Sequence, residues 1–370
     1  MKKKNIRVGL GLITIFGLCV GSGLMAEHVA PLADRPNLQP SPLIHRVPIR
    51  RPDSEIAPKI KRSPVVAIID TGIDFSHPDL RGHEWVNKDE IPGNGIDDDG
   101  NGYVDDKNGY DFTGRTGNVF DTHGHGTHIA GIITKLAPSA KIMNLKYFNR
   151  GVTGAEALKA SLEAMRYAIR MKADIINYSG GGTIASPEEL QVLAEASRKG
   201  ILVIAAAGNE SSNSERQPFY PANYKLPNIL SVTAIDETES GDLILPTSNY
   251  GIRSVAVAAQ GKDVESTLPG GRYGRMTGTS QATAVVTGTA ARLLEQNPLM
   301  SPEEAIARIV ASAETSAALA GKTRFGSKLA PKRALAFRSA EESAERTAFI
   351  KALRDHVEIQ ARRPAYGGSF

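Results

Sequence analysis

The chain has almost no cysteine, which limits what can hold it rigid. Among 370 residues there is one cysteine, Cys19, and it lies inside an apolar run at residues 8–25. A single cysteine excludes an intramolecular disulfide, so a large core or bound metal must stabilise the remainder. Hydrophobic residues make up 41% of the chain, which is enough for such a core.

Acidic residues are absent from the first 26 positions, and the whole chain lacks a large excess of either charge. Lys2, Lys3, Lys4 and Arg7 precede the first acid, Glu27, and they account for the net charge of +4. Because the rest of the chain is near neutral, no nucleic-acid partner is expected.

Both ends of the chain differ in composition from its middle. Residues 1–26, basic and then apolar, are predicted to be a signal peptide or an N-terminal anchor. The protein is therefore expected to be secreted or to lie in the periplasm or cell envelope, with membrane contact only if this segment is retained. Residues 27–63, rich in proline and arginine, are interpreted as a linker or short pro-segment, and residues 339–370 as an amphipathic helical tail.

Residues 64–338 alternate between apolar runs and helical patterns. The runs predicted as buried strands are residues 65–69, 142–145, 175–177, 201–206, 229–232 and 255–258. The predicted helices are residues 154–171, 187–198 with Ser186 as N-cap, 280–294, and one more that opens at Ser301. This alternation favours a single α/β domain, a three-layer sandwich with a mainly parallel central sheet flanked by helices.

Four polar residues stand where a predicted strand gives way to a turn or helix. They are Asp70 in AIIDTGID, His125 in GHGTHIAG, Asn209 in AAAGNE and Ser280 in GTSQATA. In a doubly wound sheet such turns gather reactive groups at one edge. A serine hydroxyl needs a base, for which His125 is the candidate, and Asp70 would orient the imidazole and stabilise its charged form.

Acyl transfer also places negative charge on a carbonyl oxygen, which requires a fixed donor. Asn209 follows small residues that let a substrate lie close, and Ser280 opens a helix whose dipole favours an anion. Taken alone, Asp70 is more simply a turn residue and His125 a structural histidine. The four together predict a serine hydrolase with Asp70, His125 and Ser280 as catalytic residues and Asn209 in the oxyanion hole.

The order and the local motifs of these residues resemble the subtilisin-like serine peptidases, the subtilases. The resemblance covers about residues 64–337 and includes DTGIDFSHPDL, GHGTHIAG, AAAGNE, YPANY and STLPGGRYGRMTGTS. It implies a secreted endopeptidase that cleaves proteins or peptides through an acyl-enzyme on Ser280.

The resemblance also implies where substrate binds. Ser179, Gly180 and Gly181 match the edge that takes up a peptide as an added strand, and Phe219 matches the base of the primary specificity pocket. A bulky ring there predicts a preference for small or medium side chains before the scissile bond. Glu210 is interpreted either as a pocket-rim carboxylate that favours Lys or Arg, or as a solvated surface acid.

The segment DDDGNGYVDD places oxygen ligands at alternate positions around glycines, as in the start of an EF-hand loop. The predicted ligands of a structural Ca²⁺ are the side chains of Asp97, Asp99, Asn101 and Asp105 and the backbone carbonyl of Tyr103. The alternative is an acidic surface turn without metal, in which the carboxylates would repel one another.

Two other classes of function fit parts of the pattern. A catalytically inactive subtilase-fold module that binds peptides would keep the fold, but the intact Asp70, His125, Asn209 and Ser280 argue against it. A nucleotide-binding protein would need a glycine-rich phosphate loop after its first strand, where the acidic turn DTGID stands instead. Gln281 replaces the methionine that usually follows the family's serine, which removes no reactive group. A monomer is expected.

Overall fold

The computed structural model describes residues 63–238 and 241–336. The predicted signal or anchor, nearly all of the predicted linker and the predicted tail helix lie outside these residues. The chain divides into Met1–Lys59 and Ile60–Phe370, and the described residues all belong to the second unit. None of the described helices is both long and apolar enough to cross a membrane.

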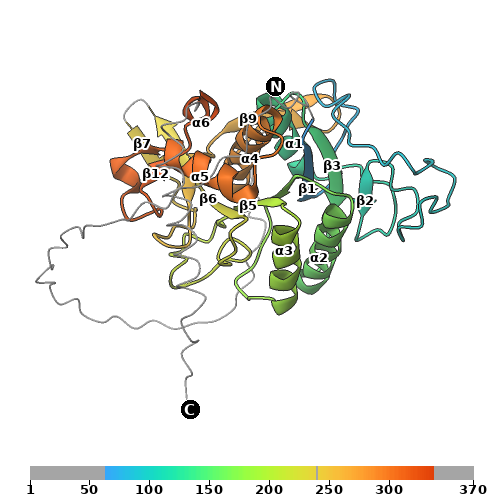
Figure 1. Ribbon diagram of the computed structural model, residues 1–370, viewed down its shortest axis with the longest axis horizontal. Helices are drawn as coiled ribbons and strands as arrows, with labels where there is room; N and C mark the ends of the chain where they lie inside the picture. Colours follow the sequence, from blue (N-terminus) through green and yellow to red (C-terminus); the bar gives the residue numbers. More distant parts are fainter. Residues whose placement is uncertain (1–62, 239–240, 337–370) are drawn as a thin grey trace, which may run out of the picture. The chain divides into compact units, whose positions relative to one another are not determined.

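A ten-stranded sheet forms the centre of the described domain (Figure 1). Its strands are β1 (Val65–Asp70), β2 (Gly109–Asp111), β3 (Lys141–Lys146), β4 (Ile175–Tyr178), β5 (Leu202–Ala206), β6 (Ile229–Thr238), β7 (Gly241–Ile244), β8 (Val257–Gln260), β11 (Glu314–Thr315) and β12 (Ser327–Lys328). Their order is β11-β12-β8-β6-β5-β4-β1-β3-β2, with β7 paired to β6. Within this sheet β7 and β11 run antiparallel to their partners and the other pairs are parallel, so the predicted mainly parallel sheet is confirmed.

Helices cover both faces of the sheet. They are α1 (His125–Leu136), α2 (Gly154–Arg170), α3 (Pro187–Arg198), α4 (Thr279–Gln296), α5 (Pro302–Ser312) and α6 (Pro331–Ala336). Alternate residues of β1 enter two cores: Val66 and Ile68 pack with residues of α1, α4 and α5, whereas Ala67 and Ile69 pack with residues of α2 and α3. This is the alternation of a strand buried on both faces, and it confirms the three-layer sandwich (Figure 1).

The helix starts fall into two kinds. Thr153, Ser186 and Ser301 cap α2, α3 and α5, and each side chain accepts a hydrogen bond from a first-turn backbone N–H. In contrast, α4 follows Gly278 and has no side-chain cap. Thr279 at the start of α4 donates its N–H to the side chain of Asn209, whereas the N–H groups of Ser280 and Gln281 remain available to a bound oxygen atom.

A two-stranded hairpin precedes α4 and was not predicted. It pairs β9 (Val264–Leu268) with β10 (Arg272–Met276) and packs on α1, where the Thr267 hydroxyl donates to the Thr127 carbonyl at 2.8 Å. Gly131 permits this close approach, because a Cβ there would lie 2.3 Å from Thr267 Oγ1. The strand expected at residues 255–258 lies two residues later, as β8.

Candidate active site

The topology places several predicted site residues at the carboxyl edge of the sheet. β1 lies between β3 and β4, so the chain crosses over β1 when it passes from β3 to β4. Ligands bind next to such a switch point in open α/β sheets. Asp70 ends β1, Ser179 follows β4, and Asn209 lies just past the end of β5.

Asp70 and His125 form a buried pair. His125 Nδ1 lies 2.7 Å from Asp70 Oδ1, and the side chain of Asp70 is 2% exposed against 15% for His125. Burial alone would lower the pKa of His125, but the negative charge of Asp70 and their hydrogen bond outweigh it, so this pKa is raised. With Nδ1 held by the carboxylate, the other ring nitrogen is left to exchange a proton with a reacting group.

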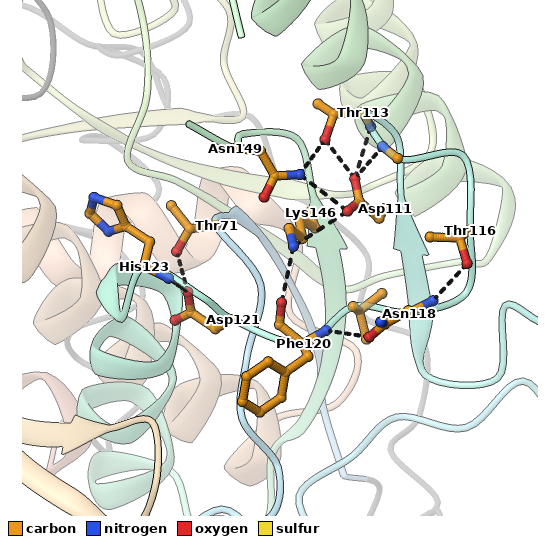
Figure 2. Close-up of polar contacts among 12 residues, drawn as sticks. Thr71, Asp111, Thr113, Thr116, Asn118, Phe120, Asp121, His123, Lys146 and Asn149 are labelled. Carbon is orange, nitrogen blue, oxygen red and sulfur yellow. Dashed lines mark hydrogen bonds and ion pairs between the residues drawn. The ribbon is translucent and has the colours of Figure 1, made fainter. Parts of the chain in front are cut away.

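A second buried carboxylate, Asp121, positions the start of α1 and was missed by the sequence analysis. It accepts hydrogen bonds from the Thr71 hydroxyl at 3.0 Å and from the His123 backbone N–H at 2.8 Å (Figure 2), and also from the N–H and hydroxyl of Thr127. Asp121 thus ties the turn after β1 to the helix that carries His125. An acid shortly before a helix start was the available signal, but it also fits an ordinary cap.

A buried ion pair holds the segment before Asp121 against the sheet. Lys146 Nζ donates to the Phe120 carbonyl at 3.0 Å and lies 3.4 Å from Asp111 Oδ2 (Figure 2). Lys146 is the register partner of Asp70 on the neighbouring strand. The backbone that leads to His125 is therefore fixed to the strand beside Asp70.

Asn209 is fixed to the turn that carries Ser280. Its Oδ1 accepts from the backbone N–H of Thr279 at 3.0 Å and from the Thr279 hydroxyl at 3.1 Å. Because a backbone N–H can only donate, the oxygen of the Asn209 amide must face Thr279, which leaves the Nδ2 hydrogens to donate elsewhere. Ser280, 8% exposed, is the next residue in the first turn of α4, so the Asn209 amide is fixed one residue away from this hydroxyl.

Helix packing sets how the His125 and Ser280 ends of α1 and α4 lie. Gly288, about two turns into α4, contacts α1 near Leu136, about three turns past His125. A Cβ at Gly288 would be 2.7 Å from Leu136 Cβ and 3.3 Å from the Ile133 carbonyl oxygen. The two helices therefore meet about two to three turns from their starts. Both starts lie at the carboxyl edge of the sheet, because His125 contacts Asp70 at the end of β1 and Thr279 contacts Asn209 just past β5.

The segment Ser179–Gly181 leaves β4 as an edge with free backbone groups. Gly182 pairs with Tyr220 through two hydrogen bonds of 2.9 and 2.7 Å, whereas no backbone partner is found within the described residues for Ser179, Gly180 or Gly181. An extended peptide can pair with such an edge.

The ring of Phe219 lies between this edge and the residue before Asn209. A Cβ on Gly181 would be 2.4 Å from Phe219 Cε1, and one on Gly208 would be 2.9 Å from Phe219 Cγ. Phe219 is 6% exposed and so fills the space between the two glycines. Glu210 lies against Gly208 as well, where its Oε2 accepts from Asn249 Nδ2 at 2.6 Å.

A buried acid, Glu189 of α3, lies among tyrosines beneath the edge segment. It is 3% exposed, and burial raises its pKa to about 7 although its interaction with the Tyr224 hydroxyl acts in the opposite direction. Its charge also acts on Tyr147 and Tyr178, the two rings that back Gly180.

Glu189 makes stability depend on pH. In the folded protein Glu189 keeps its proton up to a pKa of about 7, whereas in the unfolded chain it loses the proton near pH 4.5. The free energy of unfolding therefore decreases as pH rises from 4.5 through 7. In an inactive Ser280→Ala background, the free energy of unfolding of Glu189→Gln relative to its parent should increase by up to about 3 kcal/mol between pH 4.5 and pH 8. Urea unfolding at both pH values measures the difference. An equal difference at the two pH values would contradict the assignment.

The acidic loop brings together a different set of carboxylates from the one predicted. Of the five predicted ligands, Asp99 alone belongs to the group in which oxygens of Glu90, Asp99 and Asp106 lie within 4.8 Å of one another. Asp97 instead accepts from the Asn101 and Gly102 N–H groups, and Asp105 accepts from the Gly93 and Asn94 N–H groups. Tyr103 packs its ring against Tyr110, Phe112 and Tyr167.

Chain spacing explains why Glu90 was missed as a candidate ligand, whereas Asp106 stands in the motif itself, directly after the predicted Asp105. Glu90 precedes the motif and is brought to it by folding, when Glu90 accepts hydrogen bonds from Asp105 and Asp98 N–H groups. Burial and the charges of Asp106 and Asp98 raise the pKa of Glu90. A cation at this point would relieve that repulsion.

A carboxylate–imidazole pair, a fixed amide donor and a serine in the first turn of a helix are the groups of a serine hydrolase. Comparison with known proteins gives the family. The profile of the subtilase family matches residues 61–330. The major intracellular serine protease of Bacillus subtilis (strain 168) is 32% identical over 271 residues, which cover 70% of this chain and 75% of that protein. The chain therefore belongs to the subtilase family of serine endopeptidases, as the sequence predicted.

Two further relatives agree. Subtilisin E of Bacillus subtilis (strain 168) is 35% identical over 246 residues, which cover 63% of this chain but only 56% of that protein. The structure of fervidolysin from Fervidobacterium pennivorans, described as a keratinolytic enzyme related to subtilisin, matches with a TM-score of 0.61 and 24% identity, covering 74% of this chain and 42% of that chain. The latter similarity shows the fold.

Proposed function

We propose that the protein is an exported endopeptidase that cleaves peptide bonds through an acyl-enzyme on Ser280. The observation that carries the proposal is the 2.7 Å bond between His125 Nδ1 and Asp70 Oδ1, together with an Asn209 amide fixed to the turn before Ser280. These contacts support one base, one orienting carboxylate and one oxyanion donor around a single hydroxyl.

In this mechanism His125 takes the Ser280 proton as the hydroxyl oxygen attacks the substrate carbonyl carbon. The oxygen of that carbonyl becomes negative and accepts from Asn209 Nδ2 and the Ser280 backbone N–H. His125 then gives the proton to the departing amine, and the carbon–nitrogen bond breaks. Water enters by the same steps, again with His125 as base, and releases the acid product and free Ser280.

A serine-directed fluorophosphonate probe tests this proposal. Labelling of the purified protein, located by mass spectrometry on the peptide that contains Ser280, and parallel cleavage of casein are expected. Peptide binding without labelling or turnover would instead support the inactive binding module.

The open edge at Ser179, Gly180 and Gly181 supports substrate binding as an added strand, with the residue before the scissile bond directed toward Phe219. Because the ring fills the space between Gly181 and Gly208, we propose that small or medium side chains are preferred there. The Asn249 contact of Glu210 supports a carboxylate held at that wall rather than one that swings toward a basic substrate side chain.

Shortening Phe219 should enlarge this pocket. Phe219→Ala is expected to raise kcat/KM for substrates with phenylalanine before the scissile bond by about 10-fold or more relative to alanine substrates. Phe219→Leu should give an intermediate ratio. Competition between the two peptides in one reaction measures the ratio without knowledge of enzyme concentration. A ratio that does not change across the three proteins would refute the pocket assignment.

The oxygen-only group of Glu90, Asp99 and Asp106 fits a hard divalent cation, and we propose that these carboxylates hold a structural Ca²⁺. This set takes the place of the EF-hand-like ligands Asp97, Asn101 and Asp105. Asn101 supports the group through its amide, which donates to Asp99 and Asp106.

Calcium removal should destabilise the protein before it alters the chemistry. At a free Ca²⁺ concentration about 100 times the Kd, binding to the native state adds about 2.7 kcal/mol, so chelation should lower Tm by several degrees. Activity measured promptly at low temperature should survive. Asp106→Asn should abolish the calcium dependence of Tm, whereas the exposed neighbour change Asp98→Asn should retain it. A Tm that is insensitive to chelation in the unmodified protein would contradict the proposal.

Export is proposed from the basic and then apolar order of residues 1–26. One relative is by name an intracellular protease, so the family alone does not decide the compartment. The N-terminal sequence of protein recovered from medium, envelope and cytosol tests it, and an intact N-terminus found in the cytosol alone would overturn it.

A further inference from the structure

Gln281 is a buried amide next to the nucleophile. It follows Ser280 on α4 and is 2% exposed, and its Nε2 has no hydrogen-bond partner among the described residues. Most buried side-chain amides are hydrogen-bonded, because burying a donor without a partner destabilises the folded protein. The folded protein therefore keeps an unused donor beside its reacting group.

The amide of Gln281 lies on the same side of the nucleophile turn as that of Asn209. A methyl group on Gly278 would lie 3.3 Å from Gln281 Oε1 and 3.5 and 3.6 Å from Oδ1 and Nδ2 of Asn209. The two amides thus flank one face of Gly278.

The two amides differ in how they are held. Two hydrogen bonds from Thr279 fix the orientation of Asn209, whereas in the described part of the chain no such bond is found for the N–H₂ of Gln281. Rotation about the last side-chain bond of Gln281 brings its N–H₂ to the position where Oε1 now lies, on the same face of Gly278 as the Asn209 amide.

An acceptor comes to this face during the reaction. The proposed mechanism places a negatively charged carbonyl oxygen where Asn209 Nδ2 donates, and that charge exists only in the tetrahedral intermediate. A free amide donor on the same face of Gly278 as Asn209 can turn toward this oxygen. A donor that gains its partner only at that stage lowers the barrier without tightening substrate binding.

We propose that Gln281 is a further catalytic residue, a second side-chain donor to the oxyanion beside Asn209. The inference rests on the proposed function, because it requires Ser280 to form the tetrahedral intermediate. It predicts that loss of the Gln281 donor lowers kcat and leaves KM nearly unchanged.

The test compares Gln281→Met, which keeps the length and removes the donor, with Gln281→Glu, which places negative charge beside the oxyanion. We expect kcat to fall about 10-fold in Gln281→Met, with KM within twofold, and to fall further in Gln281→Glu. The affinity for a peptide boronic acid, which forms a tetrahedral anionic adduct on serine, should fall in parallel with kcat. Tm of Gln281→Met should be unchanged or higher, since the unpartnered donor is gone.

Thr289→Val serves as the matched control. Thr289 is also buried on α4, and its hydroxyl donates to the Val285 carbonyl at 3.0 Å. Its loss should change Tm while kcat and boronate affinity stay as in the unmodified protein.

Two results would overturn the inference. One is a Gln281→Met variant with unchanged kcat and boronate affinity, and the other is a loss of kcat that accompanies lower Tm and raised KM, as a structural role predicts. In both cases an active, fluorophosphonate-labelled parent leaves the proposed function intact. A parent that neither labels nor binds the boronate would remove the proposed function and this inference together.

Discussion

Replacement of Ser280 by alanine is expected to lower kcat roughly 10⁵- to 10⁶-fold, with little change in KM. The hydroxyl oxygen forms the bond to the substrate carbon, and the hydroxyl of the preceding Thr279 is bound to Asn209 Oδ1 at 3.1 Å. The Asn209 amide and the Ser280 backbone N–H survive the change. A residual rate roughly 10³- to 10⁴-fold above that of water is therefore expected.

The control for Ser280 is a serine that acts only on structure. Ser301 caps α5 and accepts a hydrogen bond from the Glu304 N–H at 3.2 Å. Ser301→Ala should cost about 1 kcal/mol of stability and leave kcat unchanged. Initial rates on a chromogenic peptide, with active sites counted by fluorophosphonate titration, measure both variants. Retention of more than about one percent of the activity in Ser280→Ala would exclude Ser280 as the nucleophile.

Asp70→Asn is expected to lower kcat by about 10⁴-fold at neutral pH. The carboxylate accepts from His125 Nδ1 at 2.7 Å, whereas an asparagine amide can turn its N–H₂ toward that nitrogen and stabilise the wrong tautomer. Removal of the charge also lowers the pKa of His125, because burial is then opposed only by the charge of Asp121.

The pH profile distinguishes Asp70→Asn from simple unfolding. A base works when it is unprotonated, so activity rises as pH passes through the pKa of His125. With that pKa lowered, the acid limb of kcat/KM should move to lower pH while the plateau falls. Rates between pH 4 and 9, with circular dichroism to monitor folding, measure both effects. An acid limb that moves to higher pH, or a plateau within tenfold of the parent, would contradict the role assigned to Asp70.

Much of the fold followed from local sequence. Two examples are the apolar run that forms β1 and the N-cap of α3 at Ser186. Both are short patterns of neighbouring residues, so the sequence alone predicts them. The hairpin of β9 and β10 was missed because its stability comes from contacts with α1, such as that of Thr267 with Thr127. β8 was placed two residues early because Val255 and Ala256 are buried like strand residues, although the register with β6 begins at Val257.

The candidate site divides in the same way. The sequence predicts Asp70, His125, Asn209 and Ser280, because each lies in a short motif of neighbouring residues. Their supporting groups come from elsewhere in the chain. Asp121 acts through Thr71, fifty residues away, and Glu90 joins Asp99 and Asp106 only after the loop has folded. Contacts between residues that are far apart in the sequence cannot be predicted from spacing along the chain.

The contact of Gly288 with α1 determines whether a substitution there would affect activity more than stability. Gly288 lets the helices approach at Leu136, far from the chemistry, yet the base and the nucleophile stand on the first turns of the same two helices. A methyl group at Gly288 would spread the helices by a fraction of an ångström. The folded state tolerates such a shift more readily than reacting groups that must align within that tolerance. The rate of turnover is therefore more sensitive than the melting temperature to the packing of these two helices.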